Sequence, residues 1–202
     1  MRHRRIIAAA GAALALALTG SCDRTNDAAS GVGPSPPGPF TVVDGPAGEG
    51  SRTPRFAASP GGILLSWQVE EAETGSVRFA ELRGGEWSRP RTIVSRDDLF
   101  VNWADYPSVV SLGGDGLAAH WLQHNGPGTY AYQVMLSFSG DGGVTWSPPL
   151  VPHETRTETE HGFVTLVPGD GALTVVWLDG RAYEVGPGEE MSLRAAALAV
   201  PW

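Results

Sequence analysis

Apolar residues along this chain fall in short runs separated by turns that are rich in glycine and polar residues. The runs "ILLSWQV", "LAAHWLQ" and "LTVVWLD" are typical of the pattern. Glycine (27 residues) and proline (16 residues) are both abundant, while 42% of the chain is hydrophobic. This combination predicts a packed domain of many short β-strands joined by turns, in preference to long helices.

The same arrangement of strands and turns recurs along the chain. The segments "FAASPGGILLSWQ", "PSVVSLGGDGLAAHWLQ" and "GFVTLVPGDGALTVVWLDG" each read as a strand, a Gly-rich turn and a strand that carries a tryptophan. These tryptophans are Trp67, Trp121 and Trp177, 54 and 56 positions apart. The first two segments are followed by "VRFAELRGGEWSRPRTIV" and "VMLSFSGDGGVTWSPPLV", which share Trp-Ser-x-Pro at Trp87 and Trp146. A third such half begins at "MSLRAAALAV".

The repeating unit is therefore four short antiparallel strands in about 55 residues, which is typical of a β-propeller blade. A β-sandwich is also built from short strands, but it gives no reason for the same tryptophan to recur at nearly constant spacing. We predict an all-β propeller over residues 52–202, with blades at about 52–95, 104–153 and an incomplete 161–202. The five repeated tryptophans are expected in its core.

One turn of the second blade carries a specific motif. Residues 139–146, "SGDGGVTW", fit S-x-D-x-G-x-T-W at Ser139, Asp141, Gly143, Thr145 and Trp146. This segment resembles the Asp box, or bacterial neuraminidase (BNR) repeat, of sialidase-type propellers, and the repeat resemblance covers roughly 52–200. The motif is expected to be structural, because the carboxylate can accept backbone N–H bonds and glycine tolerates positive φ. The first blade shortens the same turn to "RGGEW" without the aspartate.

The order of strands in a blade decides which loops are free to bind a ligand. The turns between the first and second strands and between the third and fourth lie on one face, and the Asp box is one of the latter. The other connections lie on the opposite face, where the resemblance implies a ligand near the central axis. They are long and polar, as a one-sided binding surface requires, and comprise 68–76, 95–106, 122–132, 153–163 and 178–190.

The first long crossing contains three candidate residues, Asn102, Trp103 and Asp105. Asn102 is a candidate for substrate binding. Trp103 lies outside the repeat positions, so it either stacks on a sugar ring or packs beneath its own loop. Asp105 either acts as an acid in catalysis or caps the turn before Pro107.

Three further candidates surround the start and end of strands in the third repeat. Asp179 and Arg181, in "WLDGR", either bind a substrate, with the guanidinium gripping a carboxylate, or form a local pair that closes the loop. Arg181 is also a catalytic candidate. His161 is either a general acid or base or a hydrogen-bonded scaffold residue.

The resemblance to sialidases implies an exo-α-sialidase-like glycoside hydrolase that acts on terminal sialic acids or related glycans. Such enzymes use an Arg triad, a Tyr–Glu nucleophilic pair and an Asp acid/base. Arg55, in "TPRFAASP", falls where the first triad arginine is expected, although the family's Ile-Pro is missing. A six-bladed propeller needs about 330 residues, so about three blades are expected here. We therefore expect the chain to be a fragment that is inactive alone. If the chain is instead complete, we expect it to self-associate. The alternative is a non-catalytic propeller that binds glycan or protein.

The N-terminus predicts export to the bacterial cell envelope. Residues 1–21 read as a signal peptide, with "MRHRR" before the apolar "IIAAAGAALALAL". "TGSC" resembles a lipobox, which implies lipidation of Cys22 and membrane attachment, periplasmic or at the outer surface. The alternative is an ordinary secretory signal with an incidental cysteine. Residues 22–51, rich in Gly and Pro, are expected to form a flexible tether.

Composition narrows the possible partners. The net charge is −8, and three of the 14 basic residues lie in the first five positions, so nucleic acid is not an expected partner. The histidines are scattered and there is one cysteine, so we expect no metal site and no cofactor. A glycan or small-molecule ligand on the face opposite the Asp box remains the expected partner.

Overall fold

The computed structural model describes residues 38, 42–154, 156–185 and 190–201. The predicted signal peptide, Cys22 and most of the predicted tether lie outside the described residues. The chain divides into two units, Met1–Val42 and Val43–Trp202, and the strands and the helix described below all lie in the second.

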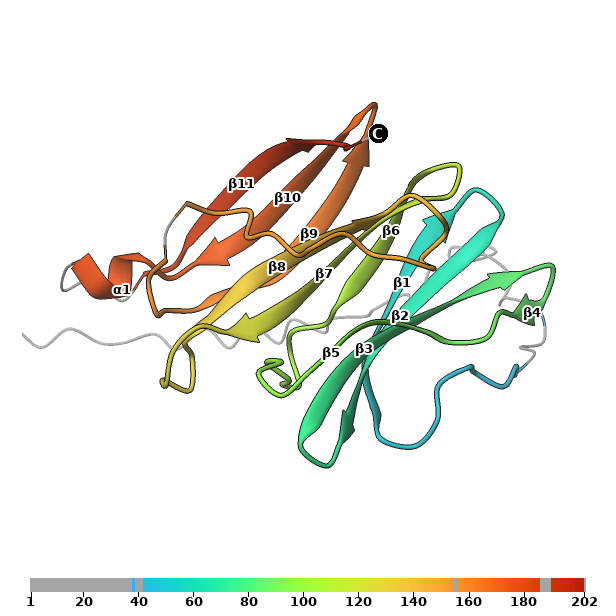
Figure 1. Ribbon diagram of the computed structural model, residues 1–202, viewed down its shortest axis with the longest axis horizontal. Coiled ribbons are helices and arrows are strands. Elements are labelled where there is room, and N and C mark those ends of the chain that lie inside the picture. Colours follow the sequence, from blue (N-terminus) through green and yellow to red (C-terminus); the bar gives the residue numbers. More distant parts are fainter. Residues whose placement is uncertain (1–37, 39–41, 155, 186–189, 202) are drawn as a thin grey trace, which may run out of the picture. The chain divides into compact units, whose positions relative to one another are not determined.

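The second unit consists of three antiparallel sheets that follow one another along the chain (Figure 1). The first sheet contains β1 (Ser51–Ser59), β2 (Gly62–Glu71), β3 (Thr74–Arg83), β4 (Glu86–Trp87) and β5 (Arg91–Arg96). The second contains β6 (Ser108–Gly113), β7 (Gly116–His124) and β8 (Tyr132–Ser139). The third contains β9 (His161–Gly169), β10 (Ala172–Asp179) and β11 (Ser192–Ala199), with the short helix α1 (Ala182–Val185) between its last two strands.

This is an all-β, propeller-like fold, as the repeat predicted. Consecutive strands in each sheet pair antiparallel, except that β5 pairs with β3 and not with β4. Because β6 contacts both β1 and β9, the first strands of all three sheets meet. The fourth strand of the second sheet is reduced to a single bridge between Leu136 and Leu150, held by two backbone bonds of 2.8 Å. Pro148 and Pro149 precede it, and proline cannot donate to a strand ladder.

Apolar side chains fill both spaces between neighbouring sheets. The first interface is formed by Leu64, Phe79, Val109, Leu117 and Ala119. A larger cluster lies between the second and third sheets and includes Val134, Leu136, Phe138, Val164, Leu166, Leu173, Val175 and Trp177. Sheet-to-sheet burial is thus the main source of stability, at about 25 cal/mol for each Å² of apolar surface removed from water.

The repeated tryptophans are either buried in hydrophobic clusters or packed against them. Trp67, Trp121 and Trp177 are buried, and Trp87 packs against the cluster that contains Trp67. Trp146 packs edge-on against Phe79 of the first sheet, with ring centroids 6.0 Å apart. Each large ring therefore ties its strand to neighbouring strands or sheets.

The 139–146 turn is closed by its own polar side chains. The Asp141 carboxylate accepts bonds from the backbone N–H groups of Val144 and Thr145 and from the Thr145 hydroxyl. Ser139 donates to the same carboxylate and accepts from the N–H of Gly143. The bond from the Thr145 hydroxyl, together with the others, holds the pKa of Asp141 well below its usual range.

That turn lies at the same end of the second sheet as the β6–β7 turn. The N–H of Gly142 donates to the carbonyl of Asp115, in the β6–β7 turn, and the Gly142 carbonyl accepts a bond from Arg91 of the first sheet. The turn therefore fastens two sheets together at the end opposite the long crossings.

One local expectation, the long loop at residues 68–76, was wrong. Residues 68–76 form no long loop, because β2 continues to Glu71 and β3 starts at Thr74, which leaves a two-residue turn. Gln68 is buried and donates to the carbonyl of Phe100, so its polar side chain is satisfied within the strand.

Candidate functional site

The remaining long connections gather at one end of the sheets, which we call the loop face. It comprises the crossing at 97–107, the described residues 152–154 and 156–160 of the second crossing, and the loops at 125–131 and 180–185. Asn125 donates from its side chain to the carbonyl of Thr157, and the N–H of Glu158 donates to the carboxylate of Glu184. These bonds hold the second crossing against both loops.

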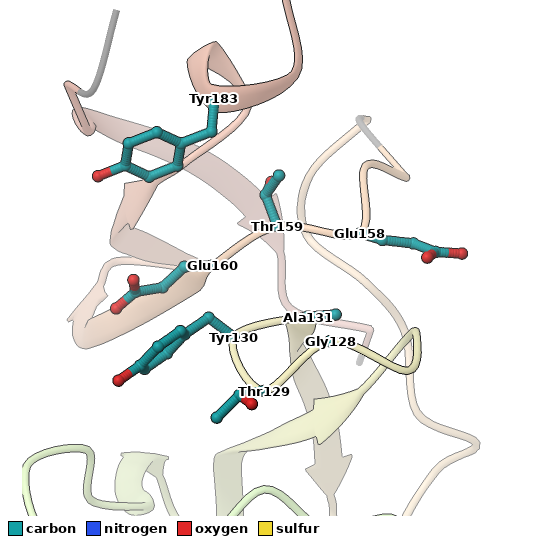
Figure 2. Close-up of a pocket in the computed structure, with 8 residues that line it drawn as sticks. All are labelled: Gly128, Thr129, Tyr130, Ala131, Glu158, Thr159, Glu160 and Tyr183. Carbon is teal, nitrogen blue, oxygen red and sulfur yellow. The ribbon is translucent and has the colours of Figure 1, made fainter.

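A cavity of about 560 Å³ opens on the loop face (Figure 2). We call it the loop-face pocket; its lining is Gly128, Thr129, Tyr130, Ala131, Glu158, Thr159, Glu160 and Tyr183. Tyr130 and Tyr183 keep 66% and 43% of their surface exposed. In Figure 2 the Glu160 side chain lies between these two tyrosines, whereas the Glu158 carboxylate points to the opposite side.

The position of Glu160 is fixed by a buried tyrosine. The Tyr132 hydroxyl donates to Oε1 of Glu160 over 2.7 Å, and the Tyr132 ring stacks on Phe100 with a centroid distance of 3.8 Å. Burial, followed by the bond to Glu160, raises the pKa of Tyr132 above its usual range. Tyr132 therefore stays neutral and serves as a hydrogen-bond donor that holds the carboxylate.

The three candidates in the first crossing lie together but do not line this pocket. The Asn102 side chain accepts the N–H groups of Ala104 and Asp105 and donates to the Asp105 carboxylate over 2.7 Å. Asp105 also accepts the N–H of Phe163 at 2.7 Å and is only 6% exposed. Asn102 therefore closes the local turn, while Asp105 ties the crossing to β9. Trp103 is 93% exposed and does not pack beneath its own loop.

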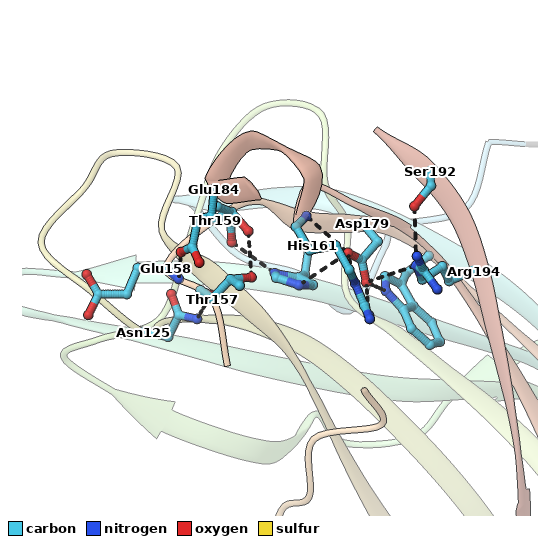
Figure 3. A network of polar contacts seen from close by, with 11 residues as sticks. Asn125, Thr157, Glu158, Thr159, His161, Asp179, Glu184, Ser192 and Arg194 are labelled. Carbon is cyan, nitrogen blue, oxygen red and sulfur yellow. Dashed lines mark hydrogen bonds and ion pairs between the residues drawn. The ribbon is translucent and has the colours of Figure 1, made fainter. Parts of the chain in front are cut away.

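A second polar group surrounds Asp179 at the end of β10 (Figure 3). Its carboxylate accepts two bonds of 2.7 Å from the Arg181 guanidinium and one of 2.9 Å from the Trp177 indole. Burial raises the pKa of Asp179, but these bonds outweigh it and hold the pKa below its usual range. Asp179 and Arg181 thus form the local pair that closes the loop, one of the two arrangements expected.

His161 lies beside this pair without reaching the surface. Its Nε2 is 3.7 Å from Asp179 Oδ1, its Nδ1 is 2.9 Å from the Thr159 carbonyl, and its ring stacks on His153. His161 and Asp179 are fully buried, so neither contacts a ligand in this conformation. Arg181 is partly exposed, as is Arg194, whose Nε lies 3.9 Å from Asp179 Oδ2.

Arg55 lies elsewhere, on β1. Its guanidinium carbon is 4.7 Å from the centre of the Tyr106 ring. It lines a separate cavity of about 290 Å³ along the first strands of the three sheets, with residues such as Phe56, Ser108 and Thr165. The sequence-predicted residues therefore occupy three places: Arg55 at this cavity, the group 102–105, and the group around Asp179.

The predicted site residues do not include Tyr130, Glu158, Glu160 or Tyr183, which line the loop-face pocket. These residues come from two loops and a crossing, and no local motif joins them. The signal that was present is that each lies in a long connection of the predicted ligand face.

The described residues contain neither a metal-binding cluster nor a membrane-spanning helix. Within residues 38, 42–154, 156–185 and 190–201, no group of three or more His, Cys, Asp or Glu residues is arranged to hold a metal ion. Over the same ranges no helix has the length and apolar character needed to span a bilayer.

Comparison with known proteins supports the fold only. No protein-family model matches the sequence, and no curated protein matches it. Among solved structures, it is similar to a mutant α-L-arabinofuranosidase from Fusarium graminearum in complex with an iminosugar inhibitor, with 12% identity and a TM-score of 0.51. The match covers 74% of this chain and 47% of that one, so the chain spans about half the length of that enzyme.

Proposed function

We propose that this chain is the glycan-binding part of an exported, glycoside-hydrolase-like propeller, and that the glycan binds in the loop-face pocket. The observation that carries the proposal is one cavity in which two exposed tyrosines flank a fixed carboxylate, Glu160. Aromatic rings offer flat apolar faces on which sugar rings stack, and carboxylates accept hydrogen bonds from hydroxyl groups. The resemblance to a propeller glycosidase supports the fold on which such a site is built.

The geometry favours binding over hydrolysis by this chain. Most glycoside hydrolases place two carboxyl groups about 5–5.5 Å or about 6.5–9.5 Å apart across the scissile bond. In the loop-face pocket the Glu158 carboxylate points away from Glu160 (Figure 2). Asp105 is buried and bonded to the Phe163 N–H, so it is not directed at a ligand either.

Substitution of Tyr183 by alanine is expected to weaken glycan binding at least about tenfold, because a sugar ring loses a stacking surface. Titration calorimetry with arabino-, chito- and chitosan-oligosaccharides and with sialyllactose would identify the glycans that bind and measure this effect. Tyr130→Ala should act in the same direction.

Trp103→Ala is the discriminating control, because Trp103 is an exposed aromatic residue outside the pocket. Unchanged binding in Tyr183→Ala together with lost binding in Trp103→Ala would show that the glycan binds at the first crossing, and would refute the proposed site.

A second candidate function is exo-α-sialidase activity in the protein to which this part belongs. It is favoured by the 139–146 motif and by Arg55, which lines the cavity along the first strands. Release of fluorophore from an aryl sialoside would test it. We expect no turnover from the 202-residue chain; turnover that disappears in Arg55→Ala would establish the hydrolase instead.

We also propose that the protein is anchored to the membrane through a lipid on Cys22, on the basis of the N-terminal sequence alone. In a bacterial host, the wild type should incorporate labelled palmitate and sediment with membranes. Cys22→Ser should abolish both, because the attachment atom is removed. Labelling that persists in Cys22→Ser would contradict the proposal, and Ser21→Ala is the matched control.

A further inference from the structure

We infer that the loop-face pocket selects a sugar with a free ammonium group, such as glucosamine in a chitosan-type oligosaccharide. The inference rests on the proposed function, since it assumes that the pocket binds a glycan. The inferred ligand carries a positive charge, and the group that would bind this charge is the carboxylate of Glu160.

The first argument is the charge of the lining. Its two ionisable acids are Glu158 and Glu160, and it contains no arginine or histidine. Within the described ranges, neither carboxylate forms an ion pair with a basic residue. Glu184, which accepts the N–H of Glu158, adds a third acid beside the pocket. A ligand carboxylate would be repelled here, and a neutral ligand would leave the negative charge without a counter-charge.

The second argument is how Glu160 is held. Its hydrogen-bond donor is the hydroxyl of Tyr132, which remains neutral because burial raises its pKa. A neutral donor orients the carboxylate without cancelling its charge, unlike the Arg181 guanidinium that neutralises Asp179. Glu160 is only partly buried, so its charge remains available to a ligand in the cavity.

The third argument is the pair of aromatic walls. Tyr130 and Tyr183 flank Glu160 (Figure 2), and an ammonium group within about 6 Å of an aromatic ring is attracted to its face. A sugar that carries an amine next to the ring can stack on one tyrosine while its ammonium group meets the carboxylate. An N-acetylated sugar keeps the stacking but loses the charge. Comparing the free-amine sugar with the N-acetylated sugar therefore separates the contribution of the charge from that of stacking.

The test compares glucosamine tetramer with N-acetylglucosamine tetramer by titration calorimetry at about pH 6, where the free amines are protonated. Wild type is expected to bind the glucosamine tetramer at least about tenfold more tightly, with an affinity that falls as salt rises. Glu160→Gln keeps the acceptor for Tyr132 but removes the charge, so it should erase this preference and leave binding of the N-acetylated form. Asp115→Asn removes one exposed charge from the opposite end of the sheet and should change nothing.

Each other outcome counts against the inference. Equal binding of both tetramers that is lost in Tyr183→Ala would overturn the charge selection and leave the proposed glycan site standing. A preference that persists in Glu160→Gln would overturn the role of that carboxylate. Absence of binding by either tetramer, and by the other oligosaccharides, would overturn the inference and the proposed function together.

Discussion

Substitution of Gly143 by alanine is expected to lower the free energy of unfolding by about 3 kcal/mol or more. Gly143 has a φ of 82°, and a Cβ at this position would lie 2.4 Å from Cζ of Phe79. Backbone strain and overpacking therefore act together at the interface between two sheets. Denaturant unfolding followed by tryptophan fluorescence would measure the change, with an unaltered dependence on denaturant indicating an intact fold.

Gly142→Ala is the matched control for that substitution. Gly142 also has a positive φ, of 70°, but the nearest atom to its Cβ position is an Arg91 guanidinium nitrogen at 3.6 Å. It should cost only the left-handed strain, about 1–2 kcal/mol. Equal losses in the two variants would show that contact with Phe79 contributes nothing and would contradict the tight packing of the turn.

The second large effect is a loss of stability in mild acid that depends on His120. Burial lowers the pKa of this imidazole to about 3, from an ordinary value of 6.5. As the pH falls, this histidine binds a proton in the unfolded chain before it does so in the folded protein. The neutral, buried imidazole therefore contributes fully to the free energy of unfolding above about pH 6.5, and this contribution declines as the pH falls toward 3. The loss between pH 6.5 and 4.5 should be about 2 kcal/mol. Asp141 and Asp179, whose pKa values are lowered, begin to lose their contributions only below about pH 4.

Two variants separate burial from hydrogen bonding at His120. His120→Asn removes the titrating group, so unfolding free energies measured at several pH values should become nearly flat between pH 6.5 and 4.5. Ser108→Ala removes the 2.7 Å bond to the imidazole Nδ1 but leaves the ring buried, so it should lower stability at every pH and retain the slope. A wild-type slope in His120→Asn would show that another group causes the acid sensitivity.

The fold class was predictable because its main determinant is local and repeated. Trp67, Trp121 and Trp177 recur at one place in the strand pattern, and all three are buried. The error at residues 68–76 has an equally local cause. Glu70 and Glu71 lie at the exposed end of β2, where polar residues are tolerated. Polarity alone does not distinguish such an exposed strand end from a loop.

The site was less predictable because it is made by contacts between distant segments. Glu160 meets Tyr132 across 28 residues, and Asp105 meets the Phe163 N–H across 58. Composition marked these residues as polar or aromatic, but only the sheet arrangement decides which of them face a cavity. His161 and Arg181 were predicted separately as candidate site residues. Both lie beside the buried Asp179 carboxylate, which explains why they are close together.

The 125–131 loop has a practical consequence for changing what the protein binds. Its two ends are joined by a bond from the Asn125 N–H to the Ala131 carbonyl, at 3.1 Å, directly beyond the paired residues His124 and Tyr132. The tip that carries Tyr130 can therefore be varied in sequence while the closing bond keeps its base in place. A combinatorial library confined to positions 127–130 is expected to yield folded variants with new ligand preferences, with the propeller serving as an unchanged display scaffold.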